Sequence, residues 1–171
     1  ARNCWAATTA APHSATPSAT PAALTHAPLQ LQLAPHLPPI LGDAGQLRQV
    51  LHNLIGNAQE AMSTPGHAEG HTARGPVVIR TEQVTLPEAE TQAVRLTLED
   101  TGPGFPAHIL RRAFEPYVTT KPSGTGLGLA MVKKIIDEHD ARIELANRSA
   151  AGALGVTGAT VTVVFRHIAP E

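Results

Sequence analysis

Three glycines at every second position, Gly124, Gly126 and Gly128, run directly into a segment with helical periodicity that extends to Ile136. Glycine tolerates positive φ angles and lets its backbone N–H group come close to a ligand. A helix that starts there directs its unpaired N–H groups and the positive end of its dipole at the same point. This arrangement suits a polyphosphate. A flexible turn before an ordinary helix is the alternative for a single glycine motif.

A carboxylate followed by glycines forms a second candidate group. Asp100 comes directly after a predicted strand and precedes Gly102 and Gly104. An ionised carboxylate only accepts hydrogen bonds, whereas an exocyclic amine such as that of adenine donates them. The segment therefore suits recognition of a flat, hydrogen-bonding base. A tight turn in which Asp100 caps its own backbone is the alternative.

Two asparagines, Asn53 and Asn57, lie four residues apart in the most periodic segment of the chain, residues 44–62. At about 100° per residue they share one edge of the predicted apolar stripe with Gln46 and Glu60. Asparagine is an indifferent helix former, so these two need partners unless they face water. Asp43 precedes the helix as its predicted N-cap.

The elements that must position these groups are read from periodicity. Alternating apolar residues predict a half-buried strand at 29–33 and further strands at 77–81 and 93–99, with a hairpin connection around Pro87. The remaining predicted elements are a short helix at 107–113, a helix at 127–139, and two strands at 142–146 and 160–165. These two strands should pair antiparallel across a loop at 147–158.

Composition excludes several classes. The 171 residues carry a net charge of −1, which gives no general attraction to nucleic acid or to an anionic membrane. Cys4 is the single cysteine, so no disulfide forms within the chain. No apolar run reaches the roughly 18 residues of a membrane helix. Residues 1–27, rich in Ala, Thr and Pro, predict a disordered tail or linker before one domain at 28–168. Glycines around His67 and His71 argue against a helical metal pair there.

Four segments in this order resemble the sequence boxes of the GHKL (Bergerat-fold) ATP-binding domains. They are similar to the N, G1, F and G2 boxes, at Asn53–Ala61, Asp100–Phe105, Phe114–Tyr117 and Gly124–Val132 respectively. Within this superfamily, residues 37–43 and 119–129 resemble bacterial two-component sensor histidine kinases, with the nitrogen-regulation (Ntr-type) group the most similar. The resemblance implies an α/β (α+β) two-layer sandwich, with a mixed, mainly antiparallel sheet covered on one face by helices.

The resemblance also implies roles for individual residues. Asn57 would hold Mg²⁺ through its side-chain oxygen with help from Asn53, and Lys121 would contact the phosphates. Asp100 would accept the hydrogen bond of the adenine amine. The cofactors implied are ATP and Mg²⁺, and the catalytic residues are Asn53, Asn57 and Lys121. The full set implied to bind the nucleotide is Asn57, Asp100, Gly102, Gly104, Phe105, Phe114, Lys121, Gly124, Thr125, Gly126, Leu127, Gly128 and Leu129.

Departures from the family pattern refine the expected activity. Hydrolysing members carry a glutamate where this chain has Asn53, and an amide cannot replace that general base. Transfer of the γ-phosphoryl group to a protein side chain is therefore favoured over hydrolysis. None of the nine histidines lies in a phosphoacceptor motif. Asp140 and Ala141 stand where relatives usually show a glycine pair after the helix.

The expected function is that of the catalytic, ATP-binding domain of a sensor histidine kinase. Its implied partners are a histidine-containing dimerisation domain in a part of the protein outside this chain and, downstream, a response regulator. No contact with nucleic acid or directly with a membrane is expected. The expected location is cytoplasmic, with the full-length parent anchored in the inner membrane. A stand-alone serine kinase of the anti-sigma type and a non-catalytic nucleotide-binding or docking fragment are the alternatives.

Overall fold

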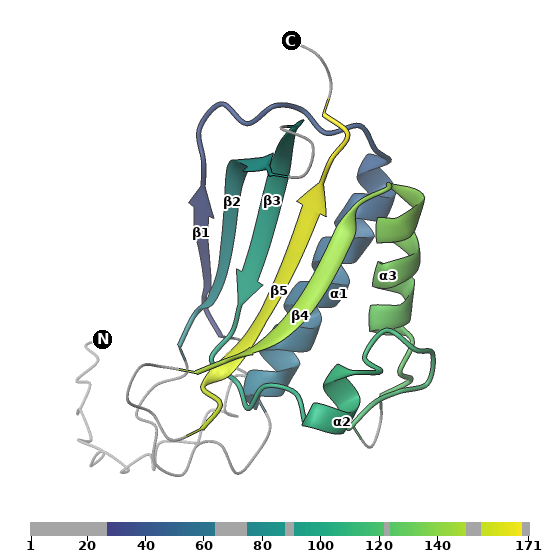
Figure 1. The fold of residues 1–171 in the computed structure, drawn as a ribbon. Helices are drawn as coiled ribbons and strands as arrows, with labels where there is room; N and C mark the ends of the chain where they lie inside the picture. The colour runs from purple at the N-terminus through teal and green to yellow at the C-terminus, as the bar shows by residue number, and fades with distance from the viewer. Residues whose placement is uncertain (1–26, 64–74, 88–90, 122–123, 150–154, 169–171) are drawn as a thin grey trace, which may run out of the picture.

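A computed structural model describes residues 27–63, 75–87, 91–121, 124–149 and 155–168 of the chain (Figure 1). The strands form a single sheet in the order β1-β2-β3-β5-β4, and the two longer helices pack on one face of it. The predicted two-layer sandwich is thus confirmed. In chain order the elements are β1 (Leu29–Leu33), α1 (Ala44–Ser63), β2 (Val77–Leu86), β3 (Thr91–Glu99), α2 (Ala107–Leu110), α3 (Gly128–Glu138), β4 (Arg142–Arg148) and β5 (Gly158–Phe165).

The sheet is mixed and mainly antiparallel, as predicted. β1 pairs parallel to β2, and the pairs β2–β3, β3–β5 and β4–β5 are antiparallel. β2 and β3 are longer than predicted because their polar ends also pair, from Glu82 opposite Arg95 out to Leu86 opposite Thr91. An ion pair of 3.0 Å between Arg95 and Glu82 supports this extension.

The predicted half-burial of β1 is wrong. All five of its residues are exposed, and Leu29, Leu31 and Leu33 retain 45%, 56% and 59% of their accessible surface. Leu29 and Leu31 lie beside Val77 and Ile79, which are buried. β1 forms the sheet edge farthest from α3, and no helix in the described ranges covers it (Figure 1). Alternation in the sequence identified the strand but not its edge position.

The core lies between the sheet and the helices α1 and α3. The helices bury residues spaced three and four apart, as their periodicity predicts. The predicted N-cap is confirmed, because the Asp43 Oδ1 atom accepts the Gln46 N–H at 2.8 Å. The Asp43 N–H in turn donates to His139 Nε2 at 2.9 Å, which ties the start of α1 to the end of α3. The buried helix residues are Val50, Leu54, Ala58, Met62, Val132, Ile135 and Ile136.

Two helix boundaries differ from the prediction. The predicted helix at 107–113 ends at Leu110, after which tight turns continue: the Arg112 N–H donates to the Ile109 carbonyl, and the Glu115 N–H to the Arg112 carbonyl, both at 2.9 Å. α3 begins at Gly128 and ends at Glu138. Asp140 adopts φ 48° and performs the left-handed turn that glycine usually performs after a helix.

The predicted tail, residues 1–27, lies outside the described residues except for Ala27, which is buried in the core. The described part of the chain thus includes one buried residue before the expected domain boundary. Near the other end, Ile168 forms an isolated bridge with Ile40. The expectation for His67 and His71 falls outside the described residues. Within the described ranges, no helix combines the length and the apolar character needed to span a bilayer.

Candidate functional site

The side chains of Asn53 and Asn57 on α1 face the first turn of α3. A Cβ atom added at Gly128 would lie 3.8 Å from Asn57 Nδ2 and 4.0 Å from Asn53 Oδ1. Both asparagines are half-buried. The fold thus brings the polar edge of α1 to the glycine segment, although Asn57 and Gly128 are 71 positions apart in the chain. The start of α3 therefore lies directly against the two side-chain amides of α1.

Lys121 completes this polar group. Its Nζ atom lies 3.2 Å from Asn57 Oδ1 and 2.5 Å from Glu60 Oε2. Asn57 Oδ1, the oxygen predicted to hold Mg²⁺, therefore accepts a hydrogen bond from the Lys121 ammonium group, which is itself a cation. Glu60 was placed on the same helix edge by its spacing but received no predicted role. Its contact with Lys121 makes it a member of the site.

Asp100 is the one charged residue buried in the described part of the chain, with 6% of its surface exposed. Its Oδ1 atom accepts the N–H groups of Gly102 at 2.8 Å and Ala159 at 3.1 Å. Among the described residues nothing donates to Oδ2. Burial raises the pKa of this carboxyl above its ordinary value of 3.8, and the two N–H groups and Arg148 offset only part of that rise. The arrangement leaves one carboxylate oxygen for an outside donor.

The loop after Asp100 packs against the end of α1. A Cβ atom at Gly102 would lie 3.4 Å from Ala61 Cβ, and the Thr101 hydroxyl donates to Met62 Sδ at 3.4 Å. Gly104 adopts φ 71°, in the left-handed region that favours glycine. The loop, the end of β3 and the start of α3 therefore meet at one end of the molecule, beside the C-terminal half of α1 (Figure 1).

The glycine segment is held against the turn that follows α2. Gly126 adopts φ 66°, and a Cβ atom there would stand 2.5 Å from the Tyr117 carbonyl carbon. The Tyr117 N–H donates to the Gly126 carbonyl at 3.0 Å. The Gly124 N–H donates to the Lys121 carbonyl at 3.1 Å, so it is used in a turn. The N–H groups at the start of α3 have no partners within the helix and are the ones available for an anion.

The other predicted residues of this region divide into two groups. Phe114 and Leu129 are partly buried and pack against the core. Thr125 and Leu127 are exposed, and the Leu127 N–H donates to Thr125 Oγ1 at 3.4 Å. Thr125 and Leu127 thus lie at the surface beside Gly126 and Gly128, whereas Phe114 belongs to the packing against the core.

Sequence reasoning missed a contribution from the β4–β5 hairpin. Arg148 Nη1 donates to the Asp100 carbonyl at 3.0 Å. Gly158 lies against the same carbonyl, where an added Cβ would stand only 2.0 Å from the oxygen. Asn147 bonds the backbone of Phe105. The one available signal was the glycine at the start of an alternating strand, because these contacts depend on pairing between distant strands.

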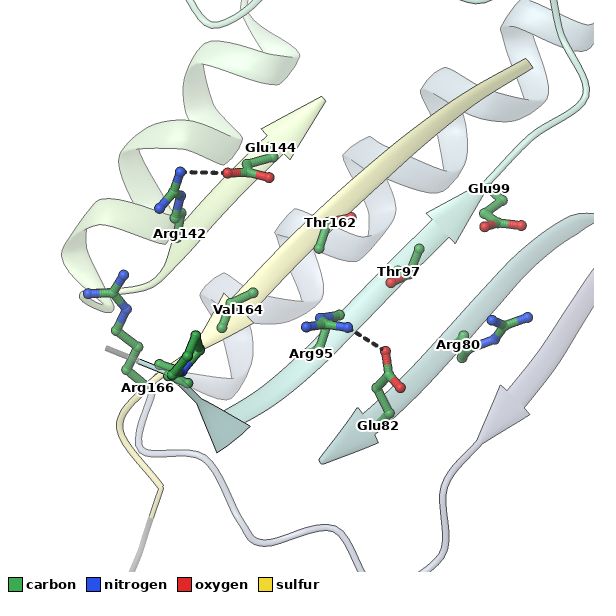
Figure 2. Close-up of a pocket in the computed structure, with 12 residues that line it drawn as sticks. Arg80, Glu82, Arg95, Thr97, Glu99, Arg142, Glu144, Thr162, Val164 and Arg166 are labelled. Carbon is green, nitrogen blue, oxygen red and sulfur yellow. Dashed lines mark hydrogen bonds and ion pairs between the residues drawn. The ribbon is translucent and has the colours of Figure 1, made fainter. Parts of the chain in front are cut away.

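A separate hollow of about 460 Å³ lies on the face of the sheet opposite the helices (Figure 2). Four of its seven charged residues pair with one another, Arg95 with Glu82 at 3.0 Å and Arg142 with Glu144 at 2.7 Å. None of the predicted site residues lines it. The candidate site is therefore the polar group between α1, the loop after Asp100 and the start of α3.

The order of these segments in the chain and the place where they meet are typical of a class of nucleotide-binding domains. Residues 42–168 match the family described as histidine kinase-, DNA gyrase B- and HSP90-like ATPase, and the chain belongs to this family. Among curated relatives it is similar to the sensory histidine kinase/phosphatase NtrB of Rhodobacter capsulatus, with 44% identity over 113 residues, which are 65% of this chain and 31% of that protein. NtrB of Rhizobium meliloti is 41% identical over 118 residues, 64% of this chain and 29% of that protein. The chain is thus an ATPase domain of this family, and its sequence is similar to that of Ntr-type sensor kinases.

Solved structures agree with this placement. Full-length ShkA in complex with AMPPNP has a TM-score of 0.61 and 28% identity, covering 84% of this chain and 26% of that one. The mycobacterial sensor histidine kinase MprB has a TM-score of 0.62 and 25% identity, covering 82% of both chains. The chain spans about a third of the length of the curated relatives it matches.

Proposed function

We propose that the four segments form one Mg-ATP site. Asp100 Oδ2 accepts the adenine amine, and the N–H groups at the start of α3 bind the phosphates. Lys121 leaves Asn57 and Glu60 to neutralise phosphate charge. The observation that carries the proposal is the buried carboxylate with one oxygen already occupied by two N–H groups and the other available to a ligand.

Asn57 and Asn53 would hold Mg²⁺, for which amide and carboxylate oxygens are suitable ligands. The residues present fit this role, because Asn57 Oδ1 accepts from the Lys121 ammonium and Glu60 adds a second oxygen to the same ammonium. When bound, the ion neutralises charge on the phosphates and helps to orient them. The residues of this chain then supply the remaining contacts to the donor.

We further propose that the γ-phosphoryl group passes to a histidine of a separate dimerisation domain, and from there to a response regulator. Asn53 has no basic group with which to activate water, so hydrolysis is not promoted. Positioning and charge neutralisation are what phosphoryl transfer chiefly needs from a protein. In this proposal the chain acts in the cytoplasm as part of a parent protein anchored in the inner membrane.

Transfer to histidine is tested by mixing this chain with γ-labelled ATP, Mg²⁺ and the dimerisation domain of its parent protein. We expect label on that domain that is lost in acid and kept in alkali, as phosphohistidine is. An acid-stable label would instead indicate a serine kinase. Nucleotide binding without any transfer would indicate a non-catalytic fragment. Asp137→Asn, on the exposed side of α3, serves as a control and should leave transfer unchanged.

A further inference from the structure

Asn147, at the end of β4, makes two hydrogen bonds to the backbone of a single residue in the loop after Asp100. Its Oδ1 atom accepts the Phe105 N–H at 2.7 Å, and its Nδ2 atom donates to the Phe105 carbonyl at 2.7 Å. A side-chain amide that satisfies both backbone groups of one residue acts like a short stretch of strand pairing. Only asparagine or glutamine offers a donor and an acceptor in this arrangement.

The loop between β3 and α2 has no regular structure of its own, so such contacts decide where it lies. Gly104, immediately before Phe105, packs on the same amide: an added Cβ would stand 2.7 Å from Asn147 Oδ1. At the start of the loop, Asp100 is fixed by bonds from Arg148 and Ala159. Asn147 thus anchors the far side of a loop whose near side carries the base-recognising carboxylate.

We propose that Asn147 is a positioning residue for recognition of the adenine base. By fixing Phe105 and Gly104 it sets the wall of the base pocket at a constant distance from Asp100. This proposal rests on the proposed function, because it presupposes that the loop binds a base. The role belongs to the pair of bonds together, since the acceptor alone leaves the Phe105 carbonyl unpaired.

The test compares ATP and GTP affinity by competition against a fluorescent ATP analogue, with urea unfolding as a measure of stability. For Asn147→Ala we expect ATP affinity to fall about tenfold, the effect of roughly one net hydrogen bond. Affinity for GTP, which lacks the amine that Asp100 accepts, should change less than twofold. Asn147→Asp keeps the acceptor but sets an anionic oxygen against the Phe105 carbonyl, so it should behave like Asn147→Ala.

Gln83→Ala is the matched control, because this amide on β2 bonds Gln92 at 3.3 Å and lies outside the loop. It should leave both affinities unchanged. Unchanged ATP affinity in Asn147→Ala would overturn the role, as would equal losses for ATP and GTP, which indicate general loosening. If the unaltered chain binds no ATP, the proposed function itself fails, so the two failures are distinguishable.

Discussion

Replacing Asp100 by asparagine is expected to reduce ATP affinity by roughly 10- to 150-fold, the equivalent of about 1.5–3 kcal/mol for a hydrogen bond to a charged group. The asparagine oxygen would still accept from Gly102 and Ala159, as Asp100 Oδ1 does. Its NH₂ group would then take the place of Oδ2 and present a donor to the donor of the adenine amine. Isothermal titration with Mg-ATP measures the loss.

The same variant should be at least as stable as the unaltered domain at neutral pH. Burial raises the pKa of Asp100 in the folded chain above its ordinary value, so the folded state takes up protons more readily than the unfolded state. Between the ordinary and the raised pKa, the free energy of unfolding therefore rises as the pH falls. At neutral pH the buried, ionised carboxylate makes an unfavourable contribution to the stability of the folded state. Asp100→Asn removes that contribution. A large drop in its unfolding free energy would contradict this account of the site.

The pKa shift also sets the pH dependence of binding. Only the ionised carboxylate presents Oδ2 to the amine without a proton on the carboxyl group, so ATP affinity should fall as the pH is lowered through the raised pKa, with a midpoint above 3.8. The component due to Asp100 should be missing in Asp100→Asn. A profile that is identical in the two proteins would assign the titration to another group.

Gly158→Ala is expected to destabilise the domain by about 3 kcal/mol or more, a large share of the roughly 5–15 kcal/mol that holds a typical domain together. The new Cβ would stand 2.0 Å from the Asp100 carbonyl oxygen and 2.9 Å from its carbonyl carbon. These are backbone atoms and cannot rotate away. Gly158 also has φ 149°, which L-residues rarely adopt. Urea unfolding followed by circular dichroism measures the change.

Two other glycines separate the causes. Gly155 also has a positive φ, 128°, but a Cβ atom added there would meet no atom within 4 Å. Gly155→Ala therefore measures the cost of backbone strain alone. Gly56→Ala lies on the exposed side of α1 with open space around it and should stabilise the helix by about 0.5–1 kcal/mol. If Gly158→Ala were no more destabilising than Gly155→Ala, close contact between β5 and Asp100 would not be the reason for this glycine.

The sequence predicted the elements whose residues repeat locally. α1 and α3 follow from their apolar spacing, and the Asp43 cap follows from its place before the first turn. The mixed sheet and the approach of Gly128 to Asn57 followed from resemblance to a family, since nothing in the spacing of these two residues along the chain brings them together.

What could not be predicted depends on neighbours distant in the chain. The leucines of β1 alternate as a half-buried strand should, but burial requires a helix over that edge, and α1 and α3 lie elsewhere. Asn147 and Gly158 act on a loop more than 40 residues earlier. Their roles appear only when β5 is placed between β3 and β4.

The central claim is that Mg-ATP binds between α1, the loop after Asp100 and the start of α3. Amide chemical shifts during titration with a non-hydrolysable ATP analogue and Mg²⁺ test it most directly. The account predicts that Gly102, Gly126, Gly128 and the Asn57 side-chain amide shift together, with one affinity. Arg80, Thr97 and Thr162, in the hollow on the opposite face, should not respond. Shifts centred on that hollow, with the glycines unchanged at saturation, would contradict it.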